Sequence, residues 1–251
     1  MVEVKEVQVL KSMEITDRDV ATLRWLAQWW GATAVQVDRW WRLDGQVGLH
    51  GPSGAPRLEV ARRRLAAMQR VGIVVGHWMP TSPARIHAVT GDGLRAAGLG
   101  TWTVPRWRWS QFRHEYAVIE IALDLLAAGW EVVPERRMRQ DDALGAGSWS
   151  LVLATDGRAA SHYPDLWVRP DDSAPWRAVE VELARKSLPR LVGILSGYRE
   201  RGAGVTYYTA ERAVADAVRR AAERARLHDL DVRRAVAAGG RQPASSRAPR
   251  G

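Results

Sequence analysis

Apolar side chains in the first hundred residues recur at the three- and four-residue spacing of amphipathic helices and then change to short runs typical of strands. Thr16 stands where a helix cap is expected, and Gly31 and Gly72 stand where helices would end. The pattern predicts helices over residues 18–30, 33–41 and 57–71, strands over 73–75 and 85–89 with a turn at 80–83, and a closing helix over 90–97.

Three helices followed by a β-hairpin is the order of a winged helix-turn-helix, and we expect that fold over residues 1–100. The third helix would enter the major groove of double-stranded DNA, and the hairpin would touch the DNA backbone. Two other interpretations are that the arginines form a solvated helix face and that the domain binds protein. The candidate DNA contacts are Arg57, Arg63, Arg64 and Arg70 in the helix and His77 and Arg85 in the hairpin.

Residues 101–110 interleave tryptophan with arginine and link this domain to a second one over residues 111–238. We expect these tryptophans to pack against the neighbouring domains, and stacking on exposed bases is the alternative. In the second domain the pattern predicts helices over 111–129, 189–201 and 211–227 and strands over 130–133, 151–154, 161–168, 176–183 and 205–209, with a charged segment at 135–139, a polar loop at 140–150 and a hairpin turn at 156–157.

Acidic residues interrupt two of these predicted strands. Asp165 lies in the first, and Glu180 and Glu182 lie two apart in the second, so these two share one face of the strand. Like charges on one face repel, and their burial is costly unless a cation or a hydrogen-bond donor compensates. A divalent metal ion is the most economical explanation, which indicates a nuclease-type site.

Composition and charge indicate the kind of molecule that the protein binds. The 251 residues carry a net charge of +9, with the excess in the N-terminal third and in residues 231–251, which favours nucleic acid over acidic proteins or anionic membranes. There are no cysteines and no apolar run of membrane-spanning length, so a cytoplasmic location without membrane contact is expected. Residues 239–251 are rich in Gly, Pro and Arg and are expected to be a disordered basic tail.

The second domain resembles the PD-(D/E)xK nucleases in the order α-β-β-β-α-β and in Pro164-Asp165 followed by Glu180-Val-Glu182. The resemblance implies that Asp165 and Glu180 bind Mg²⁺ and that a lysine stands at the third motif position. Glu182 occupies that position here, and Lys186 would reach the site from four residues on. Glu120 on the first helix would add a carboxylate. His114 and Glu115 at the entrance of that helix are candidates to contact phosphate or metal, His162 flanks Asp165, and Tyr198 resembles a core position of the family.

From end to end, about residues 14–210, the chain resembles the replication-relaxation family of actinobacterial plasmids and integrative elements. The matching features are Thr16-Asp-Arg-Asp19, Arg62 to Ile73, Val89-Thr-Gly-Asp-Gly93, His114, Tyr163-Pro-Asp165, Val179-Glu-Val-Glu182 and Tyr198. The resemblance implies a DNA-binding protein of a mobile element, acting in replication, DNA relaxation or transfer.

Three hypotheses about function follow. The winged helix binds DNA beside an inactive nuclease-like domain; or the second domain is an Mg²⁺-dependent endodeoxyribonuclease that nicks or cleaves DNA through Asp165, Glu180, Glu182 and Lys186 with Glu120; or it recruits a replication or transfer protein. The sequence defines neither the oligomeric state nor the DNA target.

Overall fold

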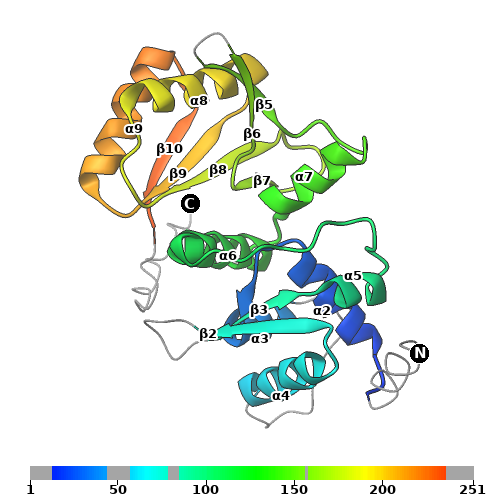
Figure 1. The fold of residues 1–251 in the computed structure, drawn as a ribbon. Helices are drawn as coiled ribbons and strands as arrows, with labels where there is room; N and C mark the ends of the chain where they lie inside the picture. The colour runs from blue at the N-terminus through cyan, green and yellow to red at the C-terminus, as the bar shows by residue number, and fades with distance from the viewer. Residues whose placement is uncertain (1–12, 44–56, 79–84, 156–157, 236–251) are drawn as a thin grey trace.

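The computed structural model describes residues 13–43, 57–78, 85–155 and 158–235. Helices and several sheets alternate along the chain, which confirms a mixed α and β class (Figure 1). The first unit contains α2 (Asp17–Ala27), β1 (Ala32–Thr33), α3 (Ala34–Trp41), α4 (Arg57–Arg70), β2 (Val74–Trp78), β3 (Arg85–Val89) and α5 (Gly91–Ala96). These elements match the predicted order, with a short strand added between the first two helices.

Two of the predicted helix starts are built by reciprocal caps. The side chain of Thr16 accepts a hydrogen bond from the Asp19 backbone, and the Asp19 carboxylate accepts one from the Thr16 backbone at 2.8 Å. Thr33 and Gln36 repeat this arrangement at the start of α3. Each cap satisfies backbone N–H groups that the first helical turn leaves without partners.

The small sheet of the first unit has the order β1-β3-β2, with both pairs antiparallel. Its apolar residues and those of α2, α3 and α4 form a core that continues into helix α6 (Phe112–Ala127) of the second unit. The two units are therefore packed together around shared apolar side chains.

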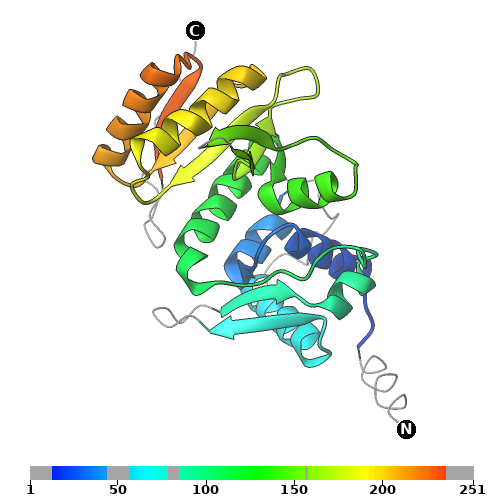
Figure 2. The ribbon, with the colours of Figure 1, turned by 45° about the horizontal axis from the view of Figure 1, so that its top comes forward.

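The main sheet of the second unit has the order β10-β9-β8-β7-β4. β4, β7 and β8 pair antiparallel, whereas β8, β9 and β10 run parallel. Helix α6 lies on one side of this sheet and α8 and α9 on the other (Figures 1 and 2). The bounds are β4 (Glu131–Pro134), α7 (Glu135–Ala143), β5 (Leu151–Thr155), β6 (Arg158–His162), β7 (Leu166–Arg169), β8 (Arg177–Glu182), α8 (Leu188–Arg201), β9 (Val205–Thr209), α9 (Arg212–Ala225) and β10 (Leu230–Arg234).

Three sequence predictions for this unit were wrong. The segment expected to be a charged stretch and polar loop begins with helix α7, which the apolar pattern misses because its buried side chains include Arg136 and Gln140. The single strand expected over 161–168 is two strands in different sheets, separated by Tyr163-Pro-Asp165, because Pro164 has no N–H for a ladder. β10 was not predicted, since it is a polar strand at the sheet edge.

Several predictions fall outside the described residues: the turns at 80–83 and 156–157 and the tail at 239–251. None of the helices within the described ranges is long and apolar enough to span a membrane.

Arg136 joins the two units from a buried position, with 2% of its surface exposed. Its Nε donates to the carbonyl of Ala27 at 2.6 Å, and its Nη2 donates to the carbonyl of Thr103. The guanidinium also lies 5.4 Å from the ring centre of Trp30 and 6.0 Å from that of Trp102. Burial lowers the pKa of Arg136 to about 10, so the side chain stays protonated at neutral pH.

Replacing Arg136 with methionine is expected to lower the free energy of unfolding by about 2–4 kcal/mol, because buried carbonyls lose charged donors. Denaturant titration of both proteins measures this difference. Arg137→Met is the matched control, since Arg137 is exposed and pairs with Asp141 at 3.5 Å, and it should change stability by less than about 0.5 kcal/mol. Equal effects of the two substitutions would contradict the role assigned to Arg136.

Candidate active site

Asp165 and Glu180 lie side by side where β7 begins. Asp165 directly precedes β7, and the antiparallel register pairs Leu166 with Val179 on β8. The backbone N–H of Val181 donates to Oδ2 of Asp165 at 2.6 Å. Glu180 is 3% exposed and lies on the same strand face as Glu182. The structure thus brings together three of the predicted carboxylates.

Histidines contact the first two carboxylates. Nε2 of His114, in the first turn of α6, lies 3.2 Å from Oδ2 of Asp165. Nε2 of His162, at the end of β6, lies 2.7 Å from Oε1 of Glu180. The hydroxyl of Tyr198 on α8 donates to the same Glu180 oxygen at 2.5 Å. The break at 163–165 therefore separates His162, which contacts Glu180, from Asp165, which is itself one of the carboxylates.

His114 and Asp165 form a charged pair. Burial alone would lower the pKa of His114, but Asp165 and Glu115 raise it to about 11. Burial alone would raise the pKa of Asp165, but His114 and the Val181 N–H together hold it below its usual range. An imidazolium therefore faces a carboxylate at neutral pH.

Lys186 forms an ion pair with Glu182. Its Nζ lies 2.5 Å from Oε2 of Glu182, and 29% of its side chain is exposed. Burial would lower the pKa of Lys186, but Glu180 and Glu182 raise it above its usual value. Burial raises the pKa of Glu182, partly offset by Lys186. The chain after β8 therefore places the Lys186 ammonium beside Glu182. We call the face of β8 that carries Glu180 and Glu182 the acidic face.

His114, His162 and Lys186 lie beside the carboxylates and can compensate their negative charge, a role for which a metal ion was expected from the sequence. His114, His162 and Lys186 each face one of the three carboxylates. The acidic face is consequently stable in the protein before any ion binds, and the repulsion between carboxylates does not by itself require a metal.

Tyr207 is a site residue that the sequence did not reveal. It pairs with Glu180 across β8 and β9, so its side chain lies on the acidic face. The ring is fully buried, and its hydroxyl has no hydrogen-bond partner among the described residues. Burial, followed by Glu180, raises the pKa of Tyr207 well above its usual value, so the hydroxyl stays protonated. A buried hydroxyl beside carboxylates is suited to donate to a bound group.

Asp165 and Glu180 each have one oxygen without a hydrogen bond among the described residues. Within the described residues, Oδ2 of Asp165 and Oε1 of Glu180 take all the hydrogen bonds of these two groups. Their second oxygens are therefore available as ligands. No three His, Asp or Glu residues in the described ranges are grouped to enclose an ion. Mg²⁺ commonly binds through one or two carboxylates and keeps several waters, so two ligands suffice.

A cavity of about 10 Å³ lies beside Asp165 between the two units. His114, Glu115 and Glu135 line it from the second unit, and Trp29 and Trp30 from the first. This space holds about one water molecule. Glu115, predicted near the site, is buried there with its Oε1 3.7 Å from Nδ1 of His114.

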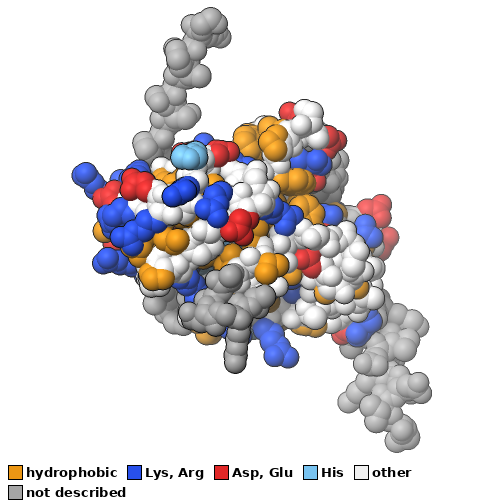
Figure 3. All heavy atoms as spheres, turned by 90° about the horizontal axis from the view of Figure 1, so that it is seen from above, with side chains coloured by type: hydrophobic (Ala, Val, Ile, Leu, Met, Phe, Trp, Pro, Cys, Tyr) orange, Lys and Arg blue, Asp and Glu red, His pale blue; other side chains and the backbone are white. Residues whose placement is uncertain are grey.

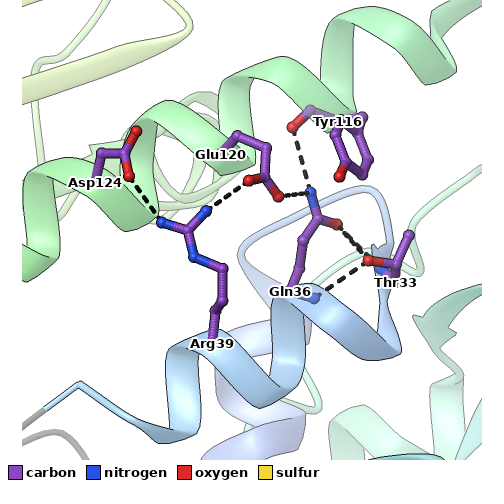
Figure 4. Close-up of polar contacts among 6 residues, drawn as sticks. All are labelled: Thr33, Gln36, Arg39, Tyr116, Glu120 and Asp124. Atoms are coloured by element: carbon purple, nitrogen blue, oxygen red, sulfur yellow. Dashed lines mark hydrogen bonds and ion pairs between the residues drawn. The ribbon is translucent and has the colours of Figure 1, made fainter. Parts of the chain in front are cut away.

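Glu120 is not brought to this site. On α6 it faces α3, where it pairs with Nη1 of Arg39 at 2.5 Å and accepts from Nε2 of Gln36 at 3.0 Å (Figure 4). Arg39 also pairs with Asp124 at 2.8 Å. These contacts join the first unit to α6, so the Glu120 carboxylate has a structural role.

Glu120→Gln is expected to lower the free energy of unfolding by no more than about 1 kcal/mol, because the ion pair with Arg39 is partly exposed. Arg39→Gln is the matched control that removes the same pair from the other side, and the double variant should show that the two losses are not additive. Denaturant titration of the three variants measures this. Additive losses would contradict the pairing assigned to Glu120.

The predicted DNA contacts on α4 differ in their surroundings. Arg63 and Arg70 are exposed on α4 and have no partner in the described part of the chain. Arg64 instead binds the buried carboxylate of Asp19, with Nε to Oδ1 at 2.7 Å, and holds α4 to α2. Arg57 begins α4, and its side chain lies outside the described residues.

The hairpin candidates lie on neighbouring strands. Arg85 donates to Gln69 at 3.1 Å and lies 4.2 Å from the ring centre of Trp78. His77 meets the ring of Trp109 edge to face at 6.5 Å. Both are partly exposed, so the hairpin presents one arginine and one histidine.

Comparison of the chain with protein-family models, with curated proteins and with solved structures gave no match. The resemblance to the replication-relaxation family thus stays a prediction, and the functional argument rests on the geometry of the site.

Proposed function

We propose that this protein binds double-stranded DNA through a winged helix-turn-helix and hydrolyses phosphodiester bonds in a PD-(D/E)xK nuclease-like domain. The observation that carries the proposal is the meeting of Asp165, Glu180 and Glu182 with Lys186 at the start of β7 and the end of β8. Carboxylates with an adjacent ammonium are the groups that metal-assisted phosphoryl chemistry uses.

The order of elements supports this choice. α6 precedes β4, β7 and β8 form an antiparallel pair, and α8 leads to the parallel β9. The helix α7 and the small sheet of β5 and β6 are inserted between β4 and β7. This is the α-β-β-β-α-β order with one insertion, and the acidic residues stand on its middle strands.

Each residue has a chemical part in the proposed reaction. Asp165 and Glu180 would hold Mg²⁺, which when bound stabilises negative charge on the scissile phosphate and lowers the pKa of a coordinated water. His114 keeps Asp165 ionised, and His162 with Tyr198 fixes one oxygen of Glu180 so that the other points away. Lys186 neutralises charge that develops on the phosphate oxygens.

DNA binding by the first unit rests on its element order and on α4. Arg63 and Arg70 present guanidinium groups without a partner among the described residues, on the helix that a winged helix places in the major groove. Of the two acidic residues on α2, Asp19 is buried against Arg64 and Thr16, and Asp17 is exposed. The exposed arginines give α4 a positive charge toward solvent.

Duplex binding is tested by fluorescence anisotropy with labelled DNA at several salt concentrations. Removing both guanidiniums in Arg63→Ala with Arg70→Ala should reduce the salt slope by about 2 if both contact phosphate. The control is Arg220→Ala, an exposed arginine on α9 without a partner in the described ranges. An unchanged slope in the α4 variant would exclude α4 as the DNA-contacting helix.

A second candidate function is a catalytically inactive DNA-binding scaffold that recruits a replication or transfer protein. It is favoured by the finding that three basic side chains each contact one of the three carboxylates. The two candidates differ in whether the wild-type protein binds Mg²⁺. The resemblance to the replication-relaxation family would place either function on a plasmid or integrative element.

A further inference from the structure

The segment that joins the two units carries exposed cations and an exposed aromatic ring. Arg106, Arg108 and Arg113 are exposed, and their guanidinium groups have no partner among the residues that the structure describes, as is also the case for Arg63 and Arg70 on α4. Trp109, which lies between them in the sequence, has 45% of its surface exposed. We call Arg106, Arg108, Trp109 and Arg113 the linker surface. Exposed cations and an exposed indole within one short segment are complementary to a polyanion with aromatic groups.

The sequence predicted that the tryptophans of this segment pack against the neighbouring domains. Trp107 does so, since its ring meets Phe112 at 6.0 Å and contacts Gly31 of the first unit. Trp102 also packs, beside Arg136. Trp109 is the exception: its ring meets those of Trp107 and His77 edge to face, yet it stays partly exposed. Packing alone therefore does not account for the exposed indole.

The linker surface lies on a path between the two predicted sites. Trp109 contacts His77 of the hairpin, and Arg113 immediately precedes His114, which binds Asp165. Figure 2 shows the linker running from α5 to the start of α6 above the hairpin of β2 and β3. A nucleic acid strand that leaves the hairpin toward the acidic site would meet these four residues.

The other arginine-rich surface is of a different kind. Seen from above, the end of the molecule formed by α8 and α9 shows acidic side chains among the basic ones (Figure 3). Asp216 there lies 3.0 Å from Arg219 and 3.9 Å from Arg212. These pairs reduce the attraction of Arg212 and Arg219 for phosphate, whereas the three arginines of the linker surface have no such pairs within the described part of the chain.

We propose that the linker surface binds a segment of single-stranded DNA, with Trp109 stacked on an unpaired base and Arg106, Arg108 and Arg113 on its phosphates. Stacking on an indole requires a base whose face is open, which a duplex does not offer. Arginines along an extended segment neutralise successive phosphates without reading sequence. The proposal rests on the proposed DNA-binding function and specifies that the strand is unpaired between the hairpin and the acidic site.

The test compares a labelled 20-nucleotide single strand with the duplex of the same sequence, by anisotropy with the full chain. Trp109→Ala should weaken single-strand binding at least fivefold and duplex binding less than twofold. Trp109→Phe should retain most of the affinity, which separates stacking from misfolding. Replacing all three arginines by alanine should reduce the single-strand salt slope by about 2.

Trp78→Ala is the matched control, because Trp78 is 61% exposed on the hairpin and already packs against Arg85. Equal losses on single strand and duplex in Trp109→Ala, or a loss in Trp78→Ala as large as in Trp109→Ala, would overturn the inference and leave duplex binding by α4 intact. If the wild type bound neither DNA, the proposed function itself would fail.

Discussion

Replacing Lys186 with methionine is expected to slow nicking of supercoiled DNA by at least about 100-fold, which is the usual scale for removing one charge-stabilising group. Methionine keeps the length and apolar stem of the side chain and removes the ammonium beside Glu182. Because a positive charge leaves the acidic face, the affinity for Mg²⁺ should stay the same or increase. Plasmid nicking and calorimetric titration of Mg²⁺ measure the two effects separately.

Arg185→Met is the matched control for this substitution. Arg185 is the exposed neighbour of Lys186 and has no ion pair in the described ranges, so its loss should change the nicking rate by less than about threefold. Equal rates for Lys186→Met and the wild type would exclude the ammonium from the reaction. Loss of Mg²⁺ binding in Lys186→Met would indicate that the substitution had disturbed the site instead.

The second large effect concerns His114. Asp165→Asn should lower the pKa of His114 from about 11, because burial then acts against Glu115 as the one remaining carboxylate among the causes that raise it. Titration of the imidazole nitrogen shifts by NMR follows this directly. Glu180→Gln is the control: it removes the partner of His162 and should lower that pKa while His114 changes little.

The same pair has a consequence for stability. The pKa of His114 is about 11 in the folded protein and about 6.5 in the unfolded chain. The stabilising contribution of the His114 imidazolium to the free energy of unfolding is therefore complete below pH about 6.5 and decreases as the pH rises toward 11. The lowered pKa of Asp165 gives the opposite dependence: its contribution is present above pH about 4 and decreases in acid. A His114→Gln variant whose stability ran parallel to the wild type between pH 6.5 and 11 would contradict the charged pair.

Local signals explain which parts of the fold were predictable. Thr16 and Thr33 cap helices through residues three positions on, so a short sequence window contains the whole interaction. The strand β9 was predicted with its observed ends because all five of its residues are Val, Thr or Tyr, which favour strands. Helix α7 and strand β10 lack such a local signal. α7 buries Arg136 against groups more than thirty residues away in the sequence, and β10 is a half-exposed edge strand.

The candidate site was predictable only in part for the same reason. The spacing of Glu180 and Glu182 fixes their common face, and Lys186 follows within reach. The partners of these groups come from other elements: His114 from α6, Tyr198 from α8 and Tyr207 from β9. Their positions depend on strand register and helix packing, which no local pattern contains. Glu120 shows the converse. The helix that carries it was predicted correctly, but its side chain faces α3, where it pairs with Arg39.

The central claim is that Asp165 and Glu180 bind a divalent ion that supports DNA cleavage. The most direct test titrates Mg²⁺ into the wild type and into Asp165→Asn with Glu180→Gln by calorimetry, and incubates the same samples with supercoiled plasmid. We predict that the wild type binds Mg²⁺ and nicks the plasmid, and that the double variant, with its thermal unfolding still cooperative, does neither. A wild type that binds DNA but neither Mg²⁺ nor Mn²⁺, and leaves the plasmid intact, would contradict the account and support the scaffold function.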